Sequence, residues 1–462
     1  IGQIDAQIPL SFEESLHLLN QGNQSLKIAD KSIEIAKAER DKLNAFWYPS
    51  LQSTGAFVHM SEKIEVKQPL SQFTDPAKDF VHSIVPDDKF ISSILDNIGA
   101  HTLTFPLLER NLTTIDANVM WPLFTGGKRI FASRIGNRMV DLAKAGREEA
   151  GATLQSELVE TYYALRLAQR VVDVREQTFL GLQKHYRNAM KLEENGMINK
   201  AERLFAQVTM DEARRELESA RKDLNVAQNA LKVLLNVEDA ISINPSSPLF
   251  MNHDLPDELY FKNLVSTGSY IVSKLRIQEA MADNQLKISK SAYIPTIALF
   301  GKQTLYAENL PKNLMPRTLV GVGFTWNIFD GLNREANIRQ TRLTKQTLQL
   351  GREKAQNELG VLVDKLYSEI QNAKDDVAAL NTTIEMSREL VRIRKKSFQE
   401  GMATSTDVID AETMLSKVQI AFLLAYYKYD VALASLLSTC GMPESFWQYS
   451  RTGQTENFIF GK

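Results

Sequence analysis

Apolar residues recur every seven positions in two long segments of this chain. A strict seven-residue repeat places them along one seam of a helix and makes the helix supercoil around a neighbour. No proline interrupts residues 123–244 or 317–442, and proline breaks the interior of a helix. We therefore predict long helices over about 129–195 and 334–400, each ~100 Å long. The repeated positions are Leu158, Leu165, Val172, Phe179 and Tyr186, and then Val363, Ile370, Val377, Ile384, Val391 and Phe398.

The two segments are parts of an internal repeat with a constant offset of 205 residues. Upstream of the long helices the offset is 246, because Pro49 pairs with Pro295. The first half therefore carries 41 additional residues, which lie between about 60 and 112. Several prolines in this insert predict a long loop with a short helix near 88–97. Matched pairs are Trp121 and Trp326, Arg129 and Arg334, and Gly196 and Gly401.

Both halves predict one order of elements: helix, two strands, long helix and return helix. The first repeat spans 1–240, with a helix over about 11–46, strands over about 51–59 and 114–124, and a return helix over about 200–235. The second repeat spans 241–443, with a helix over about 257–292, strands over about 296–306 and 318–329, and a return helix over about 405–439. Residues 444–462 form a C-terminal tail.

The second strand of each predicted pair has one apolar face and one more polar face, whereas the first strands alternate poorly and are predicted mainly from their positions in the repeat. Ile115, Val119 and Trp121 alternate with Asp116 and Asn118, which is the period of a strand. Each strand has the length that a tilted membrane strand needs. Taken alone, these strands also fit a soluble sandwich with aromatic residues in its core. The aromatic residues that would form a girdle at the membrane boundary are Trp47, Tyr48, Trp121, Phe124, Tyr293, Trp326 and Phe329.

Four strands are too few to close a barrel in a membrane. An open sheet edge in lipid leaves backbone groups without hydrogen-bond partners. If the strands cross a membrane, several chains must share one barrel. Three chains would supply 12 strands and a ring of long helices.

Composition argues against several other classes of protein. A net charge of −2 and a pI of about 6.4 argue against a nucleic-acid partner. The single Cys440 excludes a disulfide framework, and no stretch reaches the roughly 18 apolar residues of a membrane helix. No metal spacing, phosphate loop or nucleophile–base arrangement is evident, so we predict no enzyme activity, no cofactor and no metal. The chain starts at Ile1 without a visible signal peptide, as expected for a processed or trimmed form.

At both ends of the long helices the sequence resembles the TolC family of outer-membrane efflux proteins. Residues 121–127 (WPLFTGG) and 326–331 (WNIFDG) are similar to the family's junction between strand and helix. Residues 401–412 (GMATSTDVIDAE) resemble its periplasmic hairpin tip, and residues 196–202 (GMINKAE) are a degenerate copy.

The resemblance implies a mainly α protein with a membrane β-barrel. It implies a homotrimer that shares one 12-stranded barrel and a periplasmic α-helical barrel, in the outer membrane of a Gram-negative bacterium. The implied function is the exit duct of a tripartite efflux pump. Its partners would be outer-membrane lipid, a periplasmic adaptor (membrane fusion) protein and an inner-membrane efflux transporter. The alternative is a soluble trimeric coiled-coil scaffold with a small β-domain.

The resemblance also assigns a docking tip for the adaptor. It comprises Gly196, Met197, Gly401, Met402 and Ala403. The family often has leucine after the tip glycine, where this chain has methionine. Well-known members have a gate-closing arginine at the position of Ala403, so that link is missing here.

Acidic residues just after the two tips are candidates for a periplasmic gate. Asn199-x-x-Glu202 and Thr404-x-x-Asp407 both have the pattern of a capping box. Asp410 lies three residues after Asp407, on the same helix face. In a trimer these carboxylates would form stacked rings, like the family's aspartate gate. The predicted gate residues are Asp407, Asp410 and Glu202, and the alternative for Asp410 is an ordinary solvated acid.

Overall fold

The computed structural model describes residues 7–61, 64–69, 71–84, 89–99, 102–108, 111–238, 242–309 and 316–456. The chain forms two compact units. One unit comprises Ile1–Ile33, Ala143–Arg276 and Leu350–Lys462, and the other comprises Glu34–Leu142 and Ile277–Gln349. Each unit therefore takes residues from both halves of the sequence.

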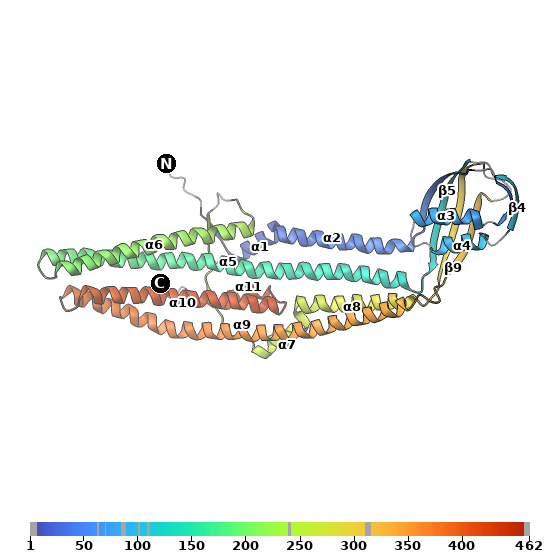
Figure 1. Ribbon diagram of the computed structural model, residues 1–462. Coiled ribbons are helices and arrows are strands. Elements are labelled where there is room, and N and C mark those ends of the chain that lie inside the picture. Colours follow the sequence, from blue (N-terminus) through green and yellow to red (C-terminus); the bar gives the residue numbers. More distant parts are fainter. Residues whose placement is uncertain are drawn as a thin grey trace. The chain divides into compact units, whose positions relative to one another are not determined.

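Four long helices form most of the structure (Figure 1). Helices α5 (Lys128–Glu194) and α9 (Asn333–Gln399) have 67 residues each. Helix α6 (Lys200–Leu235) returns along α5, and α10 (Ser405–Thr439) returns along α9. The observed bounds of α5 and α9 lie within one residue of the expected ones. The seam residues Val363, Ile370 and Ile384 are fully buried, as a coiled-coil seam requires.

The helix that leads each half is broken, which corrects the prediction of one continuous helix. The segments are α1 (Phe12–Gly22) and α2 (Gln24–Asn44), then α7 (Glu258–Gly268) and α8 (Tyr270–Ser291). Asn23 and Ser269 between them have extended backbones, with ψ of 129° at both. The Asn23 amide donates to the Leu234 carbonyl (3.2 Å), and Gly268 lies against the Cys440 carbonyl. Contacts with distant residues therefore set the breaks.

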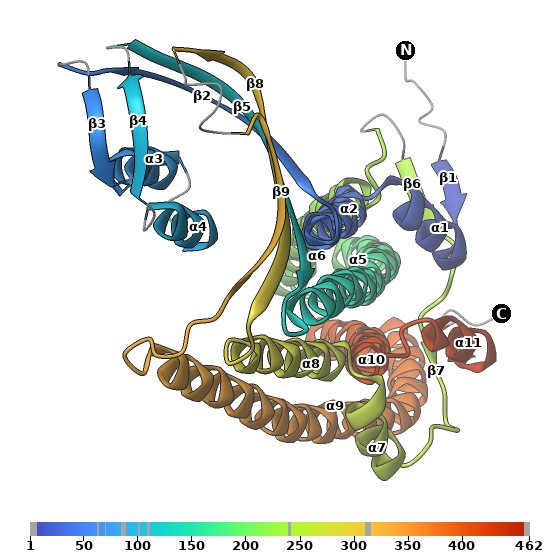
Figure 2. The same cartoon turned by 90° about the vertical axis from the view of Figure 1, so that its right-hand side faces the viewer.

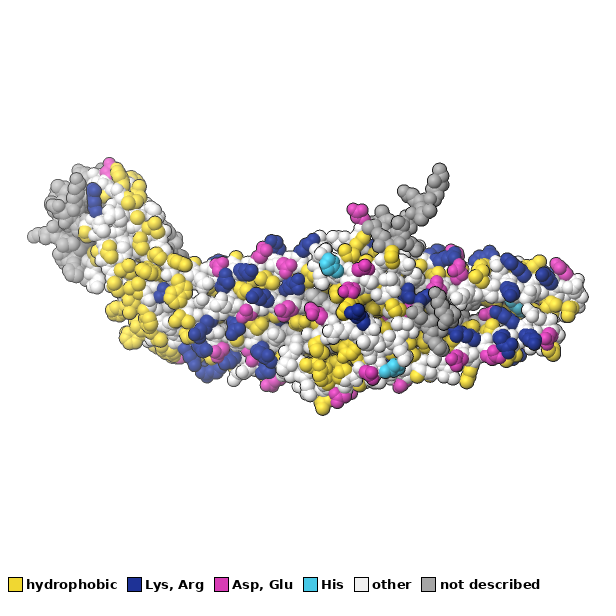
Figure 3. All heavy atoms as spheres, turned by 180° about the vertical axis from the view of Figure 1, so that it is seen from behind, with side chains coloured by type: hydrophobic (Ala, Val, Ile, Leu, Met, Phe, Trp, Pro, Cys, Tyr) yellow, Lys and Arg dark blue, Asp and Glu magenta, His cyan; other side chains and the backbone are white. Residues whose placement is uncertain are grey.

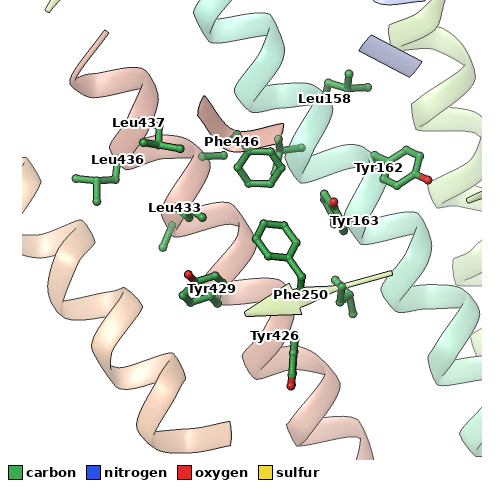
Figure 4. Close-up of a cluster of buried hydrophobic side chains, with 14 of the residues drawn as sticks. Leu158, Tyr162, Tyr163, Phe250, Tyr426, Tyr429, Leu433, Leu436, Leu437 and Phe446 are labelled. Atoms are coloured by element: carbon green, nitrogen blue, oxygen red, sulfur yellow. The ribbon is translucent and has the colours of Figure 1, made fainter. Parts of the chain in front are cut away.

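Aromatic residues form the core of the first unit (Figure 4). Tyr163 from α5, Phe250 from strand β7 (Phe250–Met251) and Phe446 from α11 (Ser445–Thr452) pack together. The centroid of the Phe446 ring lies 5.4 Å from that of Phe250 and 6.0 Å from that of Tyr163. Both contacts are edge-to-face, a geometry that aromatic pairs favour. Two small ladders border this core: β1 (Gln7–Leu10) pairs with β6 (Ser242–Pro245), and β10 (Gln454–Thr455) with β7.

Helix α10 supplies much of the same core. Among the described residues it is the one helix long and apolar enough to cross a membrane, a stretch that the sequence analysis did not find, but 61% of its most apolar window is buried in the protein. The Tyr429 hydroxyl, on the same helix, donates to the Asn252 carbonyl (3.0 Å). We therefore interpret α10 as a core helix.

The second unit contains a four-stranded antiparallel sheet in the order β2-β5-β8-β9 (Figure 2). The strands are β2 (Ser50–His59), which follows a short 3-10 helix (Ala45–Trp47), β5 (Asn111–Phe124), β8 (Thr296–Glu308) and β9 (Thr318–Thr325). Strand β9 ends four residues before the predicted 329. The chain leaves the sheet there because the Asn327 and Ile328 carbonyls accept hydrogen bonds from Arg334 (2.8 and 3.2 Å).

The insert between β2 and β5 is folded, so its interpretation as mainly a loop was wrong. It contains β3 (Ile64–Pro69), α3 (Ser71–Ile84), α4 (Lys89–Gly99) and β4 (Thr102–Leu108). Helix α4 coincides with the predicted short helix, and β3 and β4 form an antiparallel ladder. An ion pair between Lys78 and Asp96 joins α3 to α4. The prolines misled the prediction because a packed pair of amphipathic helices tolerates Pro76 inside α3.

Candidate functional site

Two tight turns join the long helices to their return helices. Gly196 and Gly401 have φ of 74° and 75°, in the left-handed region that glycine enters at little cost. The Met197 N–H donates to the Leu192 carbonyl and the Met402 N–H to the Ser397 carbonyl, both at 2.8 Å. These bonds satisfy the last carbonyls of each helix. The methionine side chains are exposed at 59% and 71%, so each turn presents an apolar group to solvent.

The turn around Gly401 leads into a complete capping box. The Thr404 hydroxyl accepts from the Asp407 N–H (3.3 Å), and the Asp407 carboxylate accepts from the Thr404 N–H (2.9 Å). The hydrogen bonds that the Thr404 N–H and hydroxyl donate to the Asp407 carboxylate lower its pKa, with a further contribution from Arg394 at 3.2 Å. The Asp407 carboxylate is therefore held by its own helix start and by α9.

The matching residue of the first turn makes a different contact, which corrects the prediction of a second capping box. Asn199 does accept from the Glu202 N–H (3.0 Å). The Glu202 carboxylate, however, accepts from the Ser405 N–H (2.9 Å), 203 residues away. It thereby satisfies an unpaired N–H at the start of α10, where a negative charge is also favoured by the helix dipole. Glu202 thus ties one turn to the other.

A buried histidine, which the sequence analysis missed, strengthens this connection. His185 lies on α5, and its Nε2 is 2.6 Å from the Ser405 hydroxyl. Its ring is 4.6 Å from that of Phe398. Burial, with a smaller contribution from the Lys395 ammonium, lowers the pKa of His185 to about 4. The imidazole is therefore neutral at physiological pH. We name Glu202, His185, Ser405 and Phe398 the tip clasp.

Asp410 takes no part in the tip clasp. Its side chain is exposed, and within the described residues it forms no hydrogen bond or ion pair. Ala403 is partly buried against a small apolar cluster that contains Phe398 and Val408. The structure thus gives Asp407 a role in capping its own helix and Glu202 a role in joining the two turns, and it leaves Asp410 exposed to solvent.

A polar cleft of about 480 Å³ lies between α5, α9 and α10. Its walls include Gly181, Arg388, Ser416 and an ion pair between the partly exposed Lys395 and the buried Glu412. Among the described residues, no group of three or more His, Cys, Asp or Glu side chains could hold a metal ion.

The aromatic residues predicted as a membrane girdle lie at the ends of the sheet, and all are exposed. Their exposed fractions range from 40% for Trp121 to 74% for Phe329. The Trp121 indole donates to the Trp47 carbonyl (3.1 Å), and the Trp326 indole donates to the Tyr293 carbonyl (3.2 Å). Hydrophobic side chains gather on this unit (Figure 3).

An arginine covers each of these junctions, a role that the sequence analysis did not assign. The Arg129 guanidinium lies 4.4 Å from the Trp47 ring centre, and that of Arg334 lies 4.2 Å from the Tyr293 ring centre. Arg129 also donates to the Leu123 carbonyl (2.7 Å). The repeat offset could have revealed this signal, because it aligns Arg129 with Arg334.

An exposed apolar sheet and long supercoiling helices in one chain are the features expected of a channel protein of the bacterial outer membrane. The chain belongs to the outer membrane efflux protein family, whose sequence model matches residues 109–237 and 271–442. It is therefore an outer-membrane protein of a Gram-negative bacterium with a periplasmic helical part. The family consists of channel-type efflux proteins, and this membership disagrees with the alternative of a soluble scaffold.

Individual relatives are distant. The chain is 23% identical over 295 residues to the outer membrane efflux protein BepC of Brucella suis, covering 61% of this chain and 62% of BepC. It is 22% identical over 293 residues to the alkaline protease secretion protein AprF of Pseudomonas aeruginosa, covering 62% and 60%. The chain thus spans about three fifths of the length of these relatives. The outer membrane protein VceC of Vibrio cholerae has a similar fold, with a TM-score of 0.72, 15% identity, and coverage of 93% and 96%.

Proposed function

We propose that three copies of this chain form one outer-membrane duct. The observation that carries this proposal is the open four-stranded sheet, whose edge strands β2 and β9 each pair on one side only within the described residues. In lipid, backbone groups at a sheet edge need partners, so the sheet must close with other copies. Three copies give a 12-stranded barrel, with the helices forming a periplasmic α-helical barrel.

The duct conducts substrates passively from an inner-membrane efflux transporter, through a periplasmic adaptor, across the outer membrane. The names of its relatives, an efflux protein and a protease secretion protein, support an export role. The docking tip for the adaptor comprises the turns with Gly196 and Met197, and with Gly401, Met402 and Ala403. Their exposed methionines are adaptable apolar contacts for a partner.

The periplasmic gate is formed by Asp407, Asp410 and Glu202. Asp410 is exposed beside the turn, where three-fold symmetry would bring its copies together. Glu202 holds the start of α10 and thereby fixes the position of the helix that carries both aspartates. Opening of the gate would require the tip clasp to move as one body or to break.

The two sequence repeats, 1–240 and 241–443, are structural repeats of one ancestral unit, followed by the tail 444–462. Support comes from the paired junctions: Trp121 and Trp326 donate to backbone carbonyls at matching positions, and Arg129 and Arg334 cover the corresponding rings. Such a match in detail follows from duplication of one fold.

The mass of the detergent-solubilised protein tests the shared barrel. We expect three chains, and a stable monomer would contradict the proposal. Val322→Lys puts a charge on the exposed apolar face and should reduce membrane-inserted trimer, since a lysine at mid-membrane costs about 2–4 kcal/mol. The matched control is Asn118→Lys on the polar face, which should assemble normally. Equal assembly of the two variants would show that the apolar face does not contact lipid.

A further inference from the structure

The sheet of the second unit has two chemically different faces. Side chains directly opposite each other in the ladder share a face, so the register divides the strands into two sets. One set is mainly apolar, and its large apolar side chains on β2, β5 and β9 are at least 36% exposed. It comprises Leu51, Phe57, Ile115, Val119, Trp121, Val320, Val322 and Phe324.

The opposite face is polar and internally hydrogen-bonded. The Lys302 ammonium lies 2.7 Å from the Asp116 carboxylate, and the Thr304 hydroxyl donates to the same carboxylate at 2.7 Å. The Asn118 amide donates to the Thr54 hydroxyl (2.9 Å). In a membrane barrel the apolar face meets lipid and the polar face lines the interior. This face is therefore the interior face.

Helix α4 of the insert packs against the interior face (Figure 2). Its Phe90 is 9% exposed, with its ring 5.4 Å from that of Phe300. Phe300 and Gly321 are partners in the register, and the next pair on the same face is Ala298 with Gly323. A Cβ atom on Gly323 would collide with the Phe90 ring. Glycine at 323 thus makes room for Phe90.

We propose that α3 and α4 form a plug inside the barrel lumen, one helical pair from each of three chains. This inference rests on the proposed trimeric barrel and adds a second constriction, separate from the periplasmic gate. A 12-stranded barrel with strands ~4.8 Å apart and tilted ~40° has a backbone diameter of ~24 Å. The six helices of three pairs, each ~10 Å across, together have a cross-section about equal to that of the lumen. The plug therefore closes the barrel to large solutes.

The contacts of the plug indicate that the insert can be deleted while the four-stranded sheet is kept. The Lys78–Asp96 ion pair joins α3 and α4 to each other, whereas the Phe90 contact joins α4 to the sheet. The second hairpin, from β8 to β9, is connected by only the nine residues 309–317. A β2–β5 hairpin without the insert is therefore compatible with this sheet.

Distances between spin labels on the three plugs test their location. We would attach the label at Ser93→Cys, an exposed position on α4. The native Cys440 is buried, and burial raises its pKa to about 12, so its thiol stays protonated and unlabelled. Plugs inside the lumen place the labels within about 25 Å of one another, whereas helices outside the barrel place them about 40 Å apart.

Short distances support the plug. Distances near 40 Å overturn it while keeping the trimer, and the absence of any dipolar coupling between chains overturns both proposals. The two failures are thereby distinguished.

Access of a reagent from outside the cell gives a second readout. Thr325→Cys lies on the interior face, two residues beyond Gly323 toward α9. A bulky polyethylene glycol maleimide should fail to label it in the full chain. The reagent should label this position once residues 62–110 are replaced by a short turn. It should label the position more weakly in the full chain with Phe90→Ala. Phe57→Ala, on the apolar face, is the matched control and should keep the protection. Labelling of the full chain at the rate of the shortened chain would overturn the plug.

Discussion

Acidification should loosen the tip clasp through His185. In the folded protein the pKa of this imidazole is about 4, whereas an exposed histidine has a pKa near 6.5. As pH falls below 6.5, His185 binds a proton when the tip clasp is open and the imidazole is exposed, but not when the clasp is closed. The stability of the closed tip must therefore rise with pH between about 4 and 6.5.

The magnitude follows from that difference in pKa. Each unit of pKa corresponds to about 1.4 kcal/mol, so at pH 5 the closed tip should lose about 2 kcal/mol relative to pH 7. The loss should appear as roughly 30-fold weaker hydrogen-exchange protection of the amides in residues 397–408, after correction for the intrinsic pH dependence of exchange. The Met402 N–H, which donates to Ser397, is a convenient probe.

Two variants distinguish the effect of His185 on the pH dependence from the effects of other groups. His185→Gln removes the titrating group and should abolish the loss between pH 7 and pH 5. His17→Gln changes an exposed histidine on α1 and should leave that loss unchanged. Asp407, whose pKa is lowered, loses its stabilising charge only at more acidic pH. An equal loss of protection in His185→Gln and in the wild type would refute the reasoning.

Further predictions concern the turns, the gate and the strand–helix junction. Gly401→Trp should abolish export yet leave trimers in the membrane, and normal export would argue against docking at this turn. Thr404→Ala should cost about 1 kcal/mol by removing a helix cap, measured by thermal unfolding; no shift in the midpoint would contradict the cap. Asp407→Ala combined with Asp410→Ala should weaken cation selectivity and block by trivalent cations in planar bilayers; unchanged block would place both outside the pore. Arg334→Ala should lower the yield of trimer, and Arg334→Lys should rescue little because lysine lacks the planar fork; full rescue would show that charge alone suffices.

Local patterns in the sequence were enough to predict the long helices. Seven-residue periodicity and the absence of proline act within one helix, so they reveal α5 and α9 to within one residue. The helix caps at Gly196, Gly401 and Thr404 are local as well, because each hydrogen bond spans a few residues. The family of the protein was also accessible, because its motifs recur at fixed spacing.

Features that depend on distant contacts were missed or misread. Glu202 has the spacing of a capping box, yet its carboxylate prefers the Ser405 N–H of another helix. His185 showed no pattern in the sequence because its partner Ser405 is 220 residues away. The extended backbone at Asn23 follows from a hydrogen bond to Leu234.

The insert shows the same limit on a larger scale. Prolines such as Pro76 locally favour a loop, but the pairing of β3 with β4 and the Lys78–Asp96 ion pair hold α3 as a helix beside α4. The sequence by itself determined where the long helices lie, where they repeat and which side of β5 and β9 is apolar. Only the tertiary structure decided which helices are tied at the tip and what lies on the polar face of the sheet. Those choices depend on packing between residues whose separation along the chain carries no periodic signal.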